Sequence, residues 1–193
     1  MRKLSVLLVV GLIIGLSITT VLADSMEIVS DGTEVNATCT WDEHPAWVAD
    51  CGDCWIWSSY KVQDPHTTVT KTFTKQFEIP GVPTSAVLNI GVDNGCTLYI
   101  NNEFAFTNGG LGGIYKGATE TLDISLFEPG DNDLKVEVTN AGDSNPDATW
   151  ETNPAGVTYK LIIKYEPWPE KVHVDIKPGS CPNPVNTKSR GVV

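Results

Sequence analysis

Apolar and polar residues alternate along most of the chain after about residue 68, and this two-residue period predicts β-strands with one buried face. In segment 86–94, one face carries Ala86, Leu88, Ile90 and Val92, whereas Asn89, Gly91 and Asp93 point the other way. The same pattern recurs in segments 68–79, 96–106, 120–127, 132–138 and 156–166. The apolar positions that share a face in these segments are Val69, Phe73, Phe77 and Ile79; Cys96, Leu98, Ile100, Phe104 and Phe106; Leu122, Ile124 and Leu126; Leu134, Val136 and Val138; and Val157, Tyr159, Leu161, Ile163 and Tyr165.

Connections rich in Gly, Pro, Asn and Asp separate these segments, at 79–85, 92–95, 128–133 and 140–147. These residue types supply the backbone angles that tight turns require. Helical periodicity is almost absent after the N-terminal segment. Short strands at this spacing therefore predict an all-β protein whose strands form an antiparallel β-sandwich.

The two ends of the chain differ in composition from this region. Residues 1–23 have the basic start, the uncharged apolar run and the small-residue end of a secretory signal peptide; the alternative is an uncleaved membrane anchor. We expect the β-sandwich to occupy residues 24–166. Residues 167–193 are rich in proline, which cannot donate to a sheet, and we interpret them as a linker with one short strand at 172–176, or the start of a truncated second β-domain.

The charge of the chain limits the partners that it can have. The formal net charge is −11, and loss of residues 1–23, which hold two positive and no negative side chains, changes it to −13. Nucleic acid is therefore excluded as an expected partner, because that binding depends on Lys and Arg contacts to phosphates. We expect a secreted or cell-surface protein with no membrane contact after signal cleavage, and its acidic side chains can collect calcium outside a cell.

Several segments together resemble a galactose-binding-domain-like jelly-roll module of secreted and cell-surface proteins. They are "CWIWSS", "KTFTKQFEIPGVPTSAVLNIGVDNGCTLYINNEFAF", "LDISLFEPGDNDLKVEVTNAG" and "NPAGVTYKLIIKY", and the resemblance covers about Trp55 to Tyr165. It implies a jelly-roll β-sandwich but no particular activity, since such folds carry many functions. The chain departs from the pattern at "YINNEF", where Asn102 replaces the usual glycine; asparagine tolerates positive φ better than most residues do, so we expect the turn to persist.

The C-terminal segment "VDIKPGSCPNPVNTKSRGVV" carries a second resemblance. It is similar to a DIKPGS segment that recurs in large bacterial and archaeal surface proteins, where it leads into a further β-domain. The resemblance implies that a downstream β-domain is a partner of the sandwich in a longer protein.

The stretch "CGDCWIWSS", residues 51–59, has three interpretations. Structural zinc would require a second close cysteine pair or histidines at ligand spacing, and a thioredoxin-like redox centre would place CxxC at the start of a helix. Neither context is present, and secretion favours disulfides, so we interpret CxxC as a staple for a tryptophan-bearing loop. The disulfide candidates are Cys39, Cys51, Cys54 and Cys96, with a free and inert thiol as the alternative for Cys96, and Cys181 is a candidate for pairing with a following module.

Tryptophans are the main candidates for ligand contact, because an exposed indole offers a flat apolar surface to the C–H face of a sugar ring. Trp41, Trp47 and Trp150 lie in polar, loop-like surroundings, and for them a ligand role and a structural role are both open. By contrast, Trp55 and Trp57 share the parity of one strand face, so we expect both in the core.

Polar residues at the strand ends form a second candidate group. Those that could bond sugar hydroxyls, or simply stabilise their own turns, are Asp93, Asn94, Asn101 and Asn140. Calcium is a further candidate ligand at Asp131, Asp133, Asp143 and Asp147, although the full EF-hand spacing is absent and solvated turns are the alternative.

Catalysis has little support in the sequence. The histidines are His44, His66 and His173, and neither a Gly-x-Ser-x-Gly elbow nor a His-Glu-x-x-His motif occurs. We therefore expect a non-catalytic extracellular module, with no required cofactor, that recognises carbohydrate through loop aromatics. The rival expectation is a structural or adhesive module of a surface layer, whose partners are cell-surface proteins.

Overall fold

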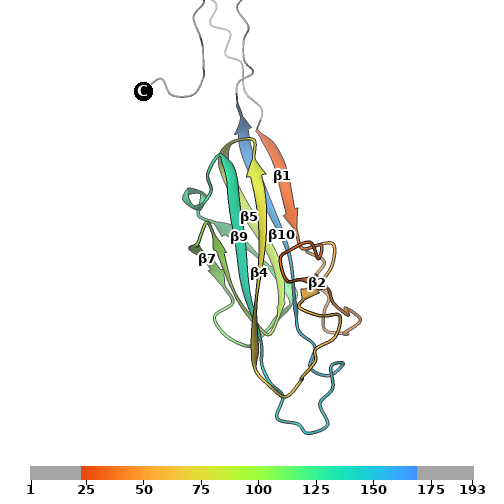
Figure 1. Cartoon of the computed structure of the whole chain (residues 1–193). Helices are drawn as coiled ribbons and strands as arrows, with labels where there is room; N and C mark the ends of the chain where they lie inside the picture. The colour runs from red at the N-terminus through yellow and green to blue at the C-terminus, as the bar shows by residue number, and fades with distance from the viewer. Residues whose placement is uncertain (1–22, 169–193) are drawn as a thin grey trace, which may run out of the picture.

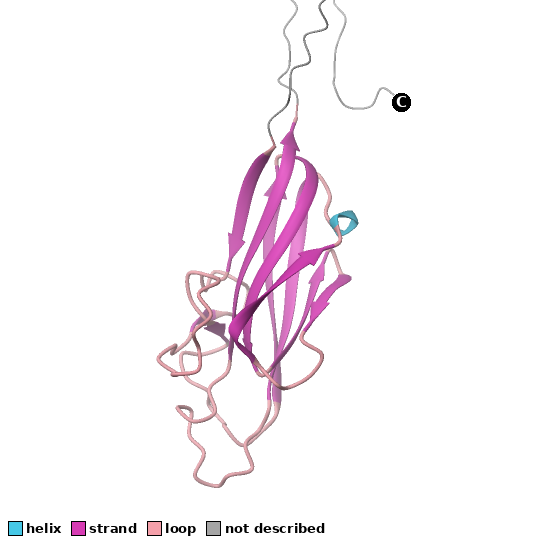
Figure 2. Ribbon diagram, turned by 180° about the vertical axis from the view of Figure 1, so that it is seen from behind, coloured by secondary structure: helices cyan, strands magenta, loops and turns pink. Residues whose placement is uncertain are grey.

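The computed structural model describes residues 23–168, which form two antiparallel sheets packed face to face as a β-sandwich (Figure 1). The prediction of an all-β antiparallel sandwich is confirmed. Its strands are β1 (Asp24–Val29), β2 (Thr38–Cys39), β3 (Ile56–Trp57), β4 (Val69–Ile79), β5 (Gly81–Asp93), β6 (Gly95–Ile100), β7 (Glu103–Thr107), β8 (Ile114–Leu122), β9 (Gly130–Asn140) and β10 (Gly156–Pro167). A 3-10 turn, Ile124–Leu126, is the helical element of this region and is cyan in Figure 2.

The larger sheet has the strand order β2-β3-β10-β5-β8, and β1 also pairs with β10. The smaller sheet has the order β4-β9-β6-β7. Consecutive strands change sheet twice along this part of the chain: β4 lies in the smaller sheet, β5 in the larger one, and β6 in the smaller one again. The single residue between β5 and β6, Asn94, thus connects the two layers.

The alternation of apolar residues correctly predicted the core faces of the central strands. Ala86 to Val92 on β5, Leu134 to Val138 on β9 and Val157 to Ile163 on β10 place their apolar side chains in one buried cluster between the sheets. Burying such side chains is the main force that holds two sheets together, at about 25 cal/mol per Å² of apolar surface.

Three details of the predicted pattern are wrong. Phe104 is 58% exposed, because the β6–β7 register shifts between Leu98 and Tyr99 and the parity does not carry through the hairpin. Ile124 and Leu126 lie in the 3-10 turn and are only half-buried. Residues 81–83, expected in a connection, instead begin β5 and pair with the end of β10.

The β6–β7 turn keeps its shape without glycine, as expected. Asn101 and Asn102 both have positive φ, at 52° and 67°. Two successive residues of this conformation make the hairpin turn that matches the strand twist, and asparagine is one of the few side chains that tolerates it.

The two ends of the described chain lie together, at the top of Figure 1, and the long loops lie at the opposite end. In the ladder, Asp24 at the start of β1 faces Tyr165 near the end of β10. We call the opposite end, formed by segments 40–68, 108–113 and 141–155, the loop end.

Within residues 23–168, no helix is long and apolar enough to span a membrane. The predicted signal peptide, the strand at 172–176, His173 and Cys181 lie outside the described residues.

Candidate functional site

The loop end gathers most of the aromatic candidates, in two separate groups. Trp41 and Trp150 contact each other edge to face, with ring centroids 4.9 Å apart. Both are half-buried, and Trp150 packs against the main core. The ammonium of Lys61 lies 3.7 Å from the Trp150 ring centroid, which is a cation–π geometry. We call Trp41 and Trp150 the indole pair.

Hydrogen bonds to one carbonyl oxygen hold the Trp41 side of the indole pair in place. The Trp41 N–H donates to the carbonyl oxygen of Tyr60 at 2.9 Å. The side chain of Thr40 donates to the same oxygen, also at 2.9 Å. Tyr60 itself is 58% exposed, and its backbone joins the segment that carries Trp41 through this carbonyl oxygen.

Trp47 does not join this pair, and of the two roles left open for it, its burial fits the structural one. It is 7% exposed and stacks on Trp55 with centroids 4.2 Å apart and planes 15° from parallel. Ala49 and Cys51 complete this second cluster, against which Tyr115 packs. Trp55 and Trp57 are both buried, as expected, but they lie in different clusters, because Trp57 packs in the main core.

Asp93, for which a sugar contact and a turn-stabilising role were both open, is also buried. Its Oδ2 accepts a hydrogen bond from the Trp47 indole N–H at 2.9 Å. Burial raises the pKa of Asp93 to about 6, although hydrogen bonds from Trp47 and Tyr115 oppose the rise. The two-residue period of β5 places the Asp93 side chain on the face away from the main core. It is the loop folded over this face that buries it.

One half of the CxxC motif is a staple. Cys54 forms a disulfide with Cys39, which closes the loop that carries Trp41 and Trp47. Cys51 and Cys96 are free and buried. Burial raises the pKa of the Cys51 thiol and raises that of Cys96 to about 12, so both thiols are protonated and inert at neutral pH. The alternative of a free thiol for Cys96 is therefore correct, and the pairing of Cys51 is not found.

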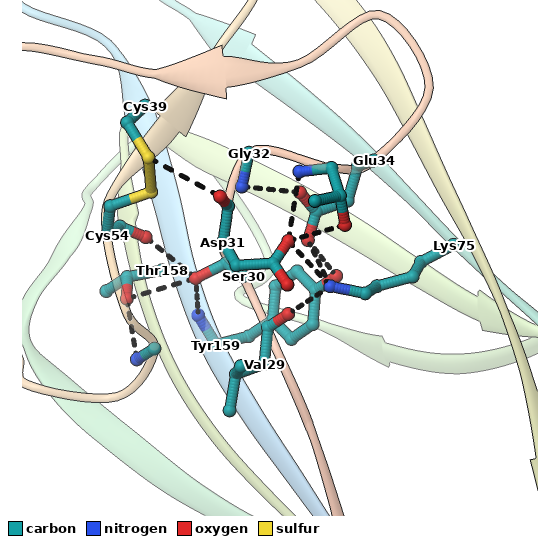
Figure 3. Close-up of a disulfide and its surroundings, with 12 residues drawn as sticks. Val29, Ser30, Asp31, Gly32, Glu34, Cys39, Cys54, Lys75, Thr158 and Tyr159 are labelled. Atoms are coloured by element: carbon teal, nitrogen blue, oxygen red, sulfur yellow. Dashed lines mark hydrogen bonds and ion pairs between the residues drawn. A yellow bond between two sulfur atoms is a disulfide. The ribbon is translucent and has the colours of Figure 1, made fainter.

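Figure 3 shows the polar network that anchors the disulfide to β10. The Ser30 hydroxyl donates to the Cys54 carbonyl oxygen at 2.8 Å and accepts from the Tyr159 backbone N–H at 3.1 Å. The Gly52 N–H donates to the Thr158 hydroxyl at 2.9 Å. Ser30 is fully buried, and these bonds join the CxxC segment to the centre of the larger sheet.

A buried carboxylate, which the sequence did not single out, completes this network. Glu34 is 3% exposed, and it accepts from the Tyr159 hydroxyl at 2.6 Å and from the Gly32 N–H at 3.0 Å. Lys75 from β4 reaches Glu34 at 3.5 Å and Asp31 at 2.8 Å (Figure 3). Because these charges are paired and hydrogen-bonded, the network serves to hold the β1–β2 connection.

The network also changes the pKa values of two of its side chains, Asp31 and Tyr159. Burial alone raises the pKa of Asp31, but hydrogen bonds from Lys75 and Thr33 outweigh it and bring the pKa to about 2. Burial and the adjacent Glu34 carboxylate raise the pKa of Tyr159 far above its usual range. Tyr159 is therefore a hydrogen-bond donor to Glu34 at all physiological pH values.

The three asparagine candidates have different roles. The Asn94 side-chain oxygen accepts from the Ala141 N–H at 2.7 Å, which ties the β5–β6 turn to the loop after β9. Asn101 donates to Leu126 and Asn132 and accepts from the Asp133 N–H, so it ties the β6–β7 turn to the 3-10 turn and to the start of β9. Asn140 is different, because its side-chain oxygen is buried and has no hydrogen-bond partner.

The calcium candidates do not come together. Asp131 and Asp133 line a groove of about 470 Å³ with Asn101 and Glu78, away from the loop end. The Asp143 carboxylate accepts from the Asn145 N–H and stabilises its own turn, and Asp147 lies in the same loop. In the described part of the chain, no group of three or more acidic, histidine or cysteine side chains has the arrangement of a metal site.

Two cavities open at the loop end. One, of about 120 Å³, is lined by Trp57, Ser58, Ser59, Val62, Gln63, Asp64, Val69, Lys71 and Asn140. The other, of about 370 Å³, is a mainly apolar hollow lined by Pro45, Ala46, Val48, Gly113, Ile114, Tyr115 and Lys116. The orphan oxygen of Asn140 thus belongs to a residue on the wall of the smaller cavity.

Comparison with known proteins finds no protein-family model and no curated protein that matches this chain. Among solved structures, a β-glucuronidase of Ruminococcus gnavus shares 12% identity over 72% of this chain and 28% of the enzyme, with a TM-score of 0.44. A β-glucuronidase of an uncultured Clostridium sp. shares 13% identity over 74% and 29%, at 0.43. A putative β-galactosidase from Bacteroides fragilis shares 18% identity over 49% and 15%, at 0.36. The chain spans less than a third of each enzyme, and likenesses this distant do not bear on activity.

Proposed function

We propose that this protein is a non-catalytic, exported module that binds carbohydrate at its loop end. The observation that carries the proposal is the indole pair. Trp41 and Trp150 come from loops far apart in sequence and meet edge to face while remaining half-exposed. They form an aromatic surface of the kind that receives the apolar face of a sugar, and we infer that Tyr60, which is exposed and whose backbone carbonyl oxygen accepts from the Trp41 N–H, adds a third ring to it.

The charge of the loop end selects the kind of carbohydrate. Segments 40–68 and 141–155 carry one lysine, Lys61, and the carboxylates of Asp42, Glu43, Asp50, Asp53, Asp64, Asp143, Asp147 and Glu151. Such a surface repels sulfated and uronic-acid polymers. The expected ligand is therefore a neutral glycan, held by stacking and hydrogen bonds.

The position of the domain ends supports presentation of the loop end to a ligand. Because β1 begins beside the end of β10, chain segments on either side of the sandwich attach at the face opposite the loops. The rival function is that of a structural spacer with protein partners. In a spacer, we expect the first and last strands to reach opposite ends of the module. The paired ends thus favour recognition over spacing.

The test is binding of the full chain to an array of neutral and acidic glycans, with and without calcium. We expect selective binding to neutral glycans, and a loss of about tenfold or more in affinity for Trp41→Ala and for Tyr60→Ala, since central aromatic contacts dominate such surfaces. The matched control is Phe104→Ala, which removes an equally exposed aromatic ring from β7, away from the loop end.

Two results would contradict the proposal. One is a folded chain that binds no glycan, and the other is equal binding by the Trp41, Tyr60 and Phe104 variants. In either case the structural-module function would become the leading hypothesis, and the search would move to protein partners at the cell surface.

A further inference from the structure

The connection between β1 and β2 carries a motif that the proposed carbohydrate site does not use. Asn36-Ala37-Thr38 is the one Asn-x-Ser/Thr triplet of the whole chain. In an exported protein this triplet is the acceptor for N-linked glycosylation, provided that its middle residue is not proline. The exposure of its side chains decides whether the folded protein can carry a glycan there.

Both functional side chains of the triplet are open and unengaged. Asn36 and Thr38 are exposed, and neither side chain makes a hydrogen bond to any other residue of segment 23–168. By contrast, the side chains of Asn94 and Asn101 are held by hydrogen bonds within the fold. The Asn36 amide is therefore available at the surface without local unfolding.

The turn that presents Asn36 is anchored at its base. Asn36 has a φ of 66°, a left-handed conformation that asparagine tolerates better than most residues do. The Ala37 N–H donates to the Glu34 carbonyl oxygen at 3.1 Å, which closes the turn. The buried side chain of Glu34 bonds to Tyr159 on β10 and pairs with Lys75 on β4, so the turn is fixed to both sheets. A glycan on Asn36 would therefore leave the protein from a fixed point.

A groove opens beside Asn36. Its volume is about 660 Å³, within the range of clefts that hold small ligands. Most of its lining residues are polar and exposed, so a sugar can reach them. Their hydroxyl, amide and ammonium groups can bond to the hydroxyls of a sugar. The lining residues are Asn36, Ala37, Ser58, Thr70, Lys71, Thr72 and Phe73.

The groove follows an uncovered edge of the smaller sheet. β4 is an edge strand, because in that sheet it pairs with β9 alone. On its other side, the isolated bridge between Val35 and Thr74 is the one ladder contact within the described chain. Residues 69–73 have no such partner at this edge, and an open edge of this kind can pair with another chain. A group attached to Asn36 would shield this edge and the neighbouring Val35, which is 60% exposed.

We propose that Asn36 is an N-glycosylation site and that the first sugar of its glycan lies in this groove, along the edge of β4. The Asn36 amide nitrogen forms a bond to the anomeric carbon of a lipid-diphosphate-linked oligosaccharide. The bond between that carbon and the diphosphate oxygen breaks, the lipid diphosphate leaves, and the amide nitrogen loses a proton. The modification rests on export, which is part of the proposed function, but not on glycan binding by the indole pair.

The first test is mass spectrometry of peptides from the full chain, isolated from the cells that naturally make it. We expect the peptide that spans Asn36 to carry an oligosaccharide on the side-chain amide. Thr38→Ala should abolish this glycan, whereas Thr38→Ser should keep it, because serine supplies the same hydroxyl. Thr72→Ala is the matched control, since it changes an exposed threonine of β4 outside the triplet, and it should keep the glycan. Variants at position 38 leave the left-handed residue unchanged, so folding is not disturbed at Asn36.

The second test locates the glycan on the surface. Hydrogen–deuterium exchange is compared between the glycosylated wild type and the unglycosylated Thr38→Ala chain. We expect the backbone amides of residues 69–73 to exchange at least about threefold more slowly in the glycosylated chain, since the sugar shields the open edge. β7, at the other edge of the same sheet, is the control and should exchange equally in both chains.

An unmodified Asn36 in the wild type would overturn the proposal, and so would a glycan that persists in Thr38→Ala. Equal exchange of residues 69–73 in the two chains would overturn the placement of the sugar in the groove. These outcomes are distinct from a failure of the proposed function. Thr38→Ala should bind the glycan array as the wild type does, and Trp41→Ala should keep its own glycan at Asn36.

Discussion

The loop end holds two pairs of tryptophans that differ in the folded protein, although one member of each pair, Trp41 and Trp47, comes from the same loop. Trp47 and Trp55 stack almost in parallel and are buried, and the Trp47 indole N–H is bonded to Asp93. Trp41 and Trp150 meet edge to face and stay half-exposed. The first pair fills the space between the loop and the sheet, and the second lies at the boundary with solvent.

The difference shows that the neighbours of a tryptophan in sequence do not determine its exposure. Trp41 and Trp47 belong to the same polar loop, and the Cys39–Cys54 disulfide closes that loop over both. Trp47 reaches over β5 and finds Trp55, Gly156 and Asp93, whereas Trp41 turns toward the loop after β9. A stabilising role is expected for the first pair and a binding role for the second.

The largest expected effect separates these roles by stability. Trp47→Ala should lower the free energy of unfolding by about 3–5 kcal/mol, because it removes a buried ring and leaves the Asp93 carboxyl without its indole donor. Trp41→Ala should cost about 1–2 kcal/mol, since its ring is half-exposed. Urea unfolding followed by circular dichroism measures both. Equal losses for the two variants would mean that the pairs do not differ in role.

A second test uses the carboxyl beneath the buried pair. The folded pKa of Asp93, about 6, is raised above the usual 3.8, so between about pH 4 and pH 6 the unfolded chain releases the proton while the folded chain keeps it. Ionisation of this group therefore makes the protein less stable as the pH rises through that window. Asp93→Asn should remove this loss and raise stability by up to about 3 kcal/mol at pH 7, with little gain at pH 4.

Unfolding curves of wild type and Asp93→Asn at pH 4, 5, 6 and 7 would measure this effect. Asp42→Asn, which changes an exposed loop carboxylate, is the matched control. Its effect on the free energy of unfolding should not grow with pH. If the free energies of unfolding of wild type and Asp93→Asn differed by the same amount at all four pH values, the raised pKa of a buried Asp93 would be contradicted.

The smallest expected effect concerns the exposed pair. Lys61 lies over the Trp150 ring, and Lys61→Met should lower the free energy of unfolding by about 0.5–1 kcal/mol, as expected for a cation–π contact at the surface. Lys116→Met, an exposed lysine on β8, is the control. A double-mutant cycle with Trp150→Leu isolates the contact. A coupling energy of zero in that cycle would show that the two side chains do not stabilise each other.

The sequence predicted the fold better than the site. The periodicity on β5, β9 and β10 identified the core faces because alternation is a property of each strand alone. It was misleading at Phe104, where a register shift inside the hairpin reverses the parity, and at Asp93, where a distant loop covers the outward face. The buried carboxylate of Glu34 carried no signal that we recognised, because its partners Tyr159 and Lys75 lie far away along the chain.

By itself, the sequence determined an antiparallel β-sandwich, the faces of its central strands and a disulfide that involves the CxxC motif. These follow from local alternation, turn chemistry and cysteine spacing. Only the tertiary structure decided that Cys39 pairs with Cys54, that Trp47 is buried while Trp41 meets Trp150, and that Asn140 has an oxygen without a partner. Each of these depends on which loops fold across which strands, and that is set by packing between segments up to 109 residues apart, from Trp41 to Trp150.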